Sequence, residues 1–257
     1  MTDLAFSPFE THLDRDRALR ILQGALAGAD DGELFLERSR AETLAFDDGR
    51  LRTASYDAEQ GFGLRAVRGE VTGYAHSTEI DEAALKKAAQ TVRLAVGDGG
   101  GTLALPPSGP MAPLYAAIDP AEGISFAARV ALLREIDAFA RALDPRVVQV
   151  SASISTSVQE IAILRPEGGL ATDIRPMARL NVSVIVESNS RRESGNAGGG
   201  GRVALDGLIA PEHWQAQVRE ALRIALVNLR SVPAPAGVMD VVLGPCLLYT
   251  SPSPRDK

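Results

Sequence analysis

The sequence predicts an α+β fold made of two α/β halves, each with an antiparallel sheet packed against helices. Three observations support this prediction. Helical and strand patterns follow the order α-ββββ-α and then α-βββ-α-β, which differs from the strand–helix alternation of parallel sheets. Hairpin-type turns separate neighbouring strands of the first half. A stretch rich in glycine and proline, residues 97–113, separates the two halves.

The first half begins and ends with a helix. The opening helix shows apolar residues at helical spacing until Gly28 ends the run. A second helix is expected from about Glu79 to Val96, with Ser77 or Thr78 as its N-cap and Asp81 completing a capping box for Thr78. The apolar residues of the opening helix are Ala18, Leu19, Ile21, Leu22, Ala25 and Leu26.

The strands of the first half are expected between these helices. Residues 33–38 alternate like a half-buried strand. Residues 43–46 and 51–56 flank an Asp-Asp-Gly turn, whose Asp-Gly pair favours a hairpin. A second hairpin joins residues 61–67 to residues 71–75.

The second half repeats this plan. Ser125 starts a helix with an apolar stripe, and residues 211–229 form the last helix. Residues 147–186 contain several strands, and residues 239–244 are expected to form a final buried strand after a Pro-rich connector. The apolar stripe contains Leu132, Ile136, Phe139 and Leu143.

A polar, glycine-rich stretch follows these strands, from Glu187 to Gly201. The run Gly198–Gly201 lacks the Lys-Ser/Thr that follows a phosphate-binding P-loop, and so does Asp98–Gly101 in the linker. Two interpretations of Gly198–Gly201 stay open. It is a mobile loop, or it permits the close approach of another backbone.

Composition excludes several functional classes. The 257 residues contain 27 Lys and Arg against 33 Asp and Glu, a net charge of −6, which argues against non-specific nucleic-acid binding. No apolar run approaches the roughly 20 residues of a membrane-spanning helix. Residues 1–10 do not have the pattern of a signal peptide, so we expect no membrane association and a cytoplasmic location.

The last twelve residues, Cys246 to Lys257, are expected to be non-native. Their sequence, CLLYTSPSPRDK, matches what one frame of a common transposase sequencing adapter encodes. A natural Ser/Pro-rich tail is the alternative. We therefore expect a gene that continues beyond Pro245. The expected domains are an N-terminal α/β subdomain at residues 1–105, a central α/β subdomain at 106–237 and the start of a further domain at 238–245. Residues 246–257 are the tail.

The sequence shows no recognisable active-site motif. The histidines His12, His76 and His213 lie far apart and fit no metal-binding spacing. The single cysteine is Cys246 in the tail, and no G-x-S-x-G nucleophile elbow occurs. Four serines share one face of a strand, which an exposed sheet face explains. They are Ser151, Ser153, Ser155 and Ser157.

Two pairs of carboxylates are candidates for acid–base chemistry. Asp47-Asp48 is explained by its hairpin turn, and nothing in the sequence places Glu187 with Glu193 in a cleft. The residues alone therefore give no catalytic, cofactor-binding or metal-ligating prediction.

The sequence nevertheless resembles the TldD/PmbA metalloproteases along most of its length. The run Gln60–Ala66, of the form Gln-Gly-x-Gly-x-Arg-Ala, places the resemblance in the TldD branch rather than with PmbA. The segments that carry the resemblance are Ser55–Ala66, Gly69–Ala75, Pro113–Tyr115, Asp173–Pro176, Gly198–Arg202, Ala225–Leu229, Ala234–Met239 and Val241–Gly244.

The resemblance implies an N-terminal α/β part followed by a β-rich C-terminal domain that carries an HExxxH zinc motif and a later cysteine ligand. The two histidines of that motif bind zinc, and its glutamate is the expected general base. HExxxH normally follows the strand that ends here at Gly244, so this chain contains none of those positions and is expected to be inactive.

The resemblance also implies partners. Family members act in the cytoplasm as TldD–PmbA heterodimers and cut unfolded or extended peptides. Such a peptide is expected to add to a sheet edge, with Gly198–Gly201 allowing its backbone to approach. The alternative function is a non-catalytic PmbA-like subunit or interaction module.

Overall fold

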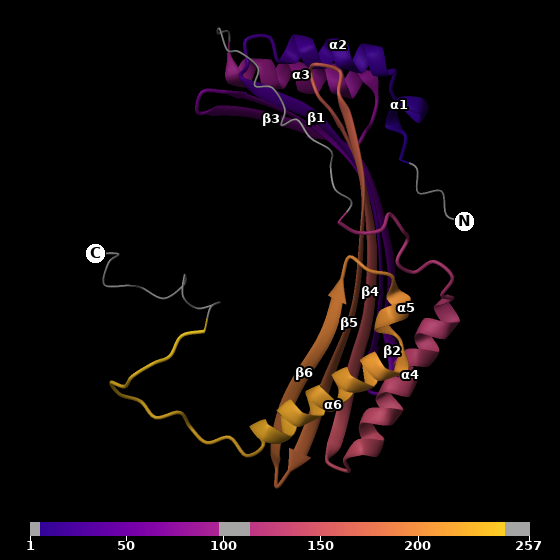
Figure 1. Ribbon diagram of the computed structural model, residues 1–257, viewed down its shortest axis with the longest axis vertical. Helices are drawn as coiled ribbons and strands as arrows, with labels where there is room; N and C mark the ends of the chain where they lie inside the picture. The colour runs from indigo at the N-terminus through magenta and orange to yellow at the C-terminus, as the bar shows by residue number, and fades with distance from the viewer. Residues whose placement is uncertain (1–5, 98–113, 245–257) are drawn as a thin grey trace.

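The computed structural model describes residues 6–97 and 114–244, and its six strands form one antiparallel sheet in the order β3-β2-β1-β4-β5-β6. The long strands bend along their length (Figure 1). The sheet is thus wide enough to carry two separate groups of helices. Its strands are β1 (Asp31–Asp47), β2 (Arg50–Arg68), β3 (Val71–Ser77), β4 (Val147–Leu164), β5 (Leu170–Ser188) and β6 (Arg191–Gly201).

All the described helices lie against one face of this sheet, on the outer side of its bend (Figure 1). α2 and α3 pack at one end, and α4, α5 and α6 pack at the other. The opposite face, on the inner side of the bend, carries no helix within the described residues. The helices are α1 (Pro8–Thr11), α2 (Arg15–Ala25), α3 (Glu82–Val96), α4 (Phe126–Leu143), α5 (Leu205–Leu208) and α6 (Pro211–Asn228).

Two hydrophobic cores form under the two groups of helices. Strand β1 contributes to both, with Leu34 and Leu36 under α2 and α3, and Leu44 and Phe46 under α4 and α6. All four have even numbers, so the period of two places them on the same face of the sheet. The α+β prediction is therefore confirmed. The separate sheets expected for the two halves are instead one sheet, because β1 pairs with β4.

The strands of the first half are longer than the sequence predicts. The expected strands at residues 33–38 and 43–46 merge into the 17-residue β1. The expected strands at residues 51–56 and 61–67 merge into the 19-residue β2. Polar residues in the middle of both strands interrupt the apolar alternation, although backbone pairing continues through them.

Local signals placed the turns and one of the two predicted N-caps correctly. Asp48 and Gly49 both have positive φ, 48° and 77°, as the predicted turn between β1 and β2 requires. The Ser125 side chain accepts a hydrogen bond from the Ala128 amide at the start of α4, as predicted. The N-cap prediction for α3 was wrong, because Asp81 caps the helix by accepting from the Ala84 amide, which leaves residues 79–81 outside it.

Two predictions for the second half were wrong. Of the two interpretations left open for Gly198–Gly201, the mobile loop is wrong, because residues 191–201 form the edge strand β6, in which these glycines pair with Ala178–Asn181 of β5. Glycine has a low strand propensity, so the pattern hid this strand. Residues 239–244 are irregular and exposed rather than a buried strand. The predicted linker at residues 97–113, apart from Gly97, and the tail from Cys246 onward lie outside the described residues.

Within residues 6–97 and 114–244, no helix has both the length and the apolar character that crossing a lipid bilayer requires.

Two glycines of β6 are expected to differ in how much stability they lose when changed to alanine. A Cβ atom at Gly195 would lie 2.0 Å from the Ala221 carbonyl oxygen of α6, so Gly195→Ala is expected to push α6 off the sheet and cost about 3 kcal/mol of unfolding free energy. A Cβ at Gly199 would meet only Gln217, at 3.8 Å, so Gly199→Ala is expected to change stability by no more than about 0.5 kcal/mol. Urea unfolding of both variants measures the difference, and equal losses would contradict the packing of α6 on β6.

Candidate functional site

A belt of charged side chains crosses the helix-bearing face between the two cores. Glu160 of β4 is 1% exposed, and both of its oxygens accept hydrogen bonds from Arg38 of β1, each at 2.8 Å. Arg40 lies one pair further along β1, with its Nη2 atom 3.7 Å from a Glu160 oxygen. The even-numbered positions of β1 that are apolar under the helices are therefore charged where no helix covers them.

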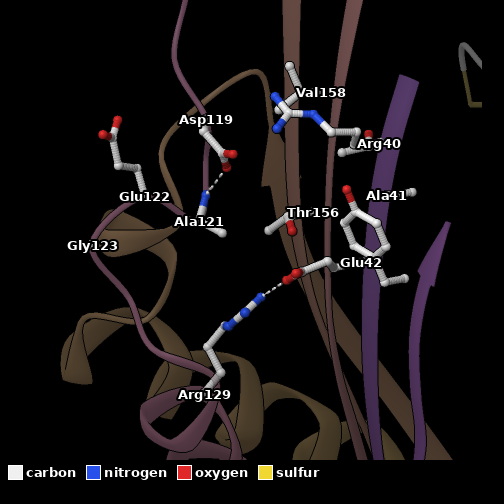
Figure 2. Close-up of a pocket in the computed structure, with 12 residues that line it drawn as sticks. Arg40, Ala41, Glu42, Asp119, Ala121, Glu122, Gly123, Arg129, Thr156 and Val158 are labelled. Atoms are coloured by element: carbon white, nitrogen blue, oxygen red, sulfur yellow. Dashed lines mark hydrogen bonds and ion pairs between the residues drawn. The ribbon is translucent and has the colours of Figure 1, made fainter. Parts of the chain in front are cut away.

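A pocket of about 360 Å³ opens at one side of this belt. Figure 2 shows Arg129 of α4 extending toward Glu42 of β1, with Arg40 at the other end of the pocket and Asp119 beside it. The Arg129 side chain is only 8% exposed, and it forms an ion pair with Glu42. The charged residues of the pocket therefore come from three separate parts of the chain.

Several nitrogen atoms at this pocket are buried without a hydrogen-bond partner among the described residues. They are Nε and Nη2 of Arg40 and Nε of Arg129. Buried donors of this kind are costly unless a ligand or water satisfies them. The arrangement can therefore bind a group that accepts hydrogen bonds. It contains no Ser, Thr or Cys hydrogen-bonded to a histidine, so it does not resemble a nucleophilic centre.

The inner face of the sheet carries a second, shallower groove, of about 570 Å³, formed by β1, β4, β5 and β6. The predicted row of serines on β4 lies on this face, where Ser155 hydrogen-bonds Thr43 of β1. At the end of the row, Asp47 accepts hydrogen bonds from the Ser151 hydroxyl at 2.6 Å and from the Gln149 amide at 2.9 Å. These two bonds lower the pKa of Asp47 from its ordinary value of 3.8, with a smaller contribution from the charge of Arg52.

The three histidines, which are candidate metal ligands, do not lie close to one another in the structure. His12 follows α1, His76 lies on β3 beside Tyr74, and His213 lies in the first turn of α6, and all three are exposed. In the part of the chain that the structure describes, no group of three or more His, Cys, Asp or Glu side chains is arranged to hold a metal ion.

The paired carboxylates each have an arginine partner instead. Asp48 pairs with Arg141, Glu187 with Arg192, and Glu193 with Arg191. They are consequently not poised as an acid–base pair.

The structure does bring together three of the segments that carry the family resemblance. The Tyr115 hydroxyl and the Arg175 guanidinium both donate to Asp173, at 2.7 Å each, and Arg202 lies over the Tyr115 ring. Burial raises the pKa of Asp173, but the hydrogen bonds from Arg175 and Tyr115 outweigh it and leave the pKa below its ordinary value. No local signal predicts this cluster, since its members are separated by up to 87 positions of sequence (115 to 202).

Comparison with known families gives two matches, in chain order. Residues 32–96 match the PmbA/TldA metallopeptidase domain 1, and residues 119–229 match the PmbA/TldA metallopeptidase central domain. The chain belongs to the PmbA/TldD family. The family resemblance predicted from the sequence is confirmed.

Curated relatives of this family agree. A metalloprotease TldD homolog of Haemophilus influenzae is 40% identical over 223 residues, which cover 84% of this chain and 46% of the relative. A TldD homolog of Buchnera aphidicola subsp. Acyrthosiphon pisum is 32% identical over 241 residues, covering 90% and 49%. The chain thus spans about half the length of the curated relatives it matches.

Solved structures share the PmbA/TldD fold. TldE from Thermococcus kodakarensis superposes with a TM-score of 0.64 at 14% identity, over 82% of this chain and 47% of that one. A candidate modulator of a DNA gyrase from Thermotoga maritima superposes with a TM-score of 0.68 at 15% identity, over 87% and 49%. At these identities the matches show the fold.

Removal of the buried carboxylate tests the belt. Glu160→Gln leaves Arg38 and Arg40 without their shared anion, so a loss of about 2–4 kcal/mol of unfolding free energy is expected, with a discount because Arg38 is partly exposed. Glu59→Gln, at an exposed position of β2, is the matched control and should stay within about 0.5 kcal/mol of the wild type. Urea denaturation of both variants measures this, and similar losses would show that the belt is not held by Glu160.

The hydrogen bonds to Asp47 predict that the stability of the folded protein depends on pH. Because its folded pKa is lowered, its ionised form contributes stability above the ordinary value of 3.8, and this contribution is lost as pH falls through the folded pKa. Asp47→Asn should therefore be less stable than the wild type near neutral pH, and the difference should shrink as pH falls below about 3.8. Denaturant titrations over a pH series measure the difference. A difference that is constant with pH would contradict the role of these hydrogen bonds.

Proposed function

We propose that this chain forms the first and central domains of a TldD-type zinc metalloprotease that hydrolyses unfolded or extended peptides in the cytoplasm, paired with a PmbA-type subunit. The observation that carries the proposal is the likeness to relatives named metalloprotease TldD homolog, at 32% to 40% identity. The two matched domains are the first and central ones by their family descriptions, which leaves about half of each relative unmatched.

The described residues do not fit a zinc site. Their histidines are exposed and separated, and no cluster of ligating side chains forms among them. No step of peptide hydrolysis is therefore assigned to these residues. The proposal places the zinc ligands and the general base in the part of the protein that follows residue 245, and this chain alone is proposed to be inactive.

The fold is suited to hold an extended peptide. β6 is the last strand of the sheet, and no described strand pairs with its outer side. An extended peptide can add to such an edge through backbone hydrogen bonds. Gly198 and Gly200 pack so closely against the backbone of β5 that a side chain at either position would clash with it. Gly199 has open space toward α6.

The direct test is to sequence the source DNA across codon 245 with adapter-free primers and to express the complete reading frame. We expect an HExxxH motif in the following codons, bound zinc in the purified protein, and hydrolysis of an unfolded peptide that a chelator abolishes. A variant with the glutamate of HExxxH changed to glutamine is the matched control, because it should keep zinc and lose turnover. The 257-residue chain should show neither zinc nor turnover.

Two results would overturn the proposal. A frame that continues without the motif would favour a non-catalytic PmbA-like subunit or interaction module. Stoichiometric zinc and peptidase activity in the 257-residue chain would show that the chemistry lies in these residues after all.

A further inference from the structure

We infer that the pocket between Arg40 and Arg129 is a binding site for a single carboxylate group. This inference concerns residues of the described chain only, and it does not depend on the proposed peptidase activity.

Arg40 is incompletely paired. Its side chain is 19% exposed, and Arg38 already donates to both oxygens of Glu160, the nearest carboxylate. Arg40 is left 3.7 Å from that carboxylate, with Nε and Nη2 lacking hydrogen-bond partners among the described residues. Binding of an anion to a guanidinium held in this way is favourable, because the anion accepts hydrogen bonds from the donors that lack a partner.

Arg129 lines the same pocket from the opposite side. It comes from α4 rather than from the sheet, and its Nε is also buried without a hydrogen-bond partner among the described residues. Glu42 occupies one end of its guanidinium. Two under-satisfied guanidinium groups, supplied by different elements, therefore border one cavity of about 360 Å³.

The charges that line the pocket indicate which class of anion it can bind. Three carboxylates also line the pocket, namely Glu42, Asp119 and Glu122. Glu42 pairs with Arg129, Asp119 accepts from the Ala121 amide, and Glu122 points away from the two arginines (Figure 2). This density of negative charge disfavours phosphate and other multiply charged anions. A single carboxylate carries only one negative charge, so it meets less of that repulsion, and it matches the planar fork of a guanidinium.

The test is calorimetric titration of the 257-residue chain at constant ionic strength. The probes are sodium acetate, the peptide acetyl-Ala-Asp-Ala-amide, its Asn counterpart, and inorganic phosphate. We expect saturable binding of acetate, the Asp peptide, or both, with at least about tenfold weaker binding of the Asn peptide and of phosphate. Binding of the Asp peptide alone identifies an acidic side chain of a polypeptide as the source, and binding of acetate shows that a free carboxylate suffices.

Variants locate the site. Arg40→Met should weaken binding at least about tenfold, Arg40→Lys should weaken it less, and Arg52→Met, which removes an exposed arginine of β2 outside the pocket, should leave it unchanged. Without a ligand, Arg40→Met should unfold at a temperature no lower than Arg52→Met, because it removes a buried and incompletely paired charge.

Three results would overturn the inference. The first is no binding of either carboxylate probe, and the second is tighter binding of phosphate. The third is a lower unfolding temperature for Arg40→Met than for Arg52→Met, which would show that the ion pair of Arg40 with Glu160 contributes more to stability than its unsatisfied donors cost. Arg40→Lys keeps the charge and secures the comparison if Arg40→Met fails to fold.

Discussion

The antiparallel pairing of β1 with β4 is the constraint on which the rest of this structure depends. It runs without a break from Leu34 opposite Leu164 to Asp47 opposite Ser151. Because side chains alternate along a strand, this single register places the apolar residues of both cores on one face. A one-residue slip would turn both cores and the charged belt onto the opposite face together.

The belt is a direct consequence of that continuity. Two groups of helices cover the two ends of a sheet whose strands continue between them, so the middle of β1 and β4 passes through a region without a helical cover. Charged residues can occupy this region because Glu160 neutralises Arg38 at hydrogen-bonding distance. The same gap gives the segment before α4 access to the sheet, and it creates the pocket between Arg40 and Arg129.

The sequence predicts the parts of this fold that local patterns control. Helical spacing located α2, α4 and α6, and the Asp48-Gly49 turn set the first hairpin. The lengths of β1 and β2 were missed because charged residues interrupt the alternation in the belt, and β6 was missed because glycines carry no strand pattern. The contacts of Tyr115 with Asp173, and of Arg129 with Glu42, join distant segments, so only the tertiary fold reveals them.

Amide hydrogen exchange in the belt tests the central claim, a single continuous sheet, most directly. The account predicts that the amides of residues 39–43 in β1 and 155–159 in β4 exchange as slowly as those under the two cores, since one cooperative unfolding must open them. Fast exchange in the belt, with slow exchange at both ends, would contradict it and would show two independently folded halves.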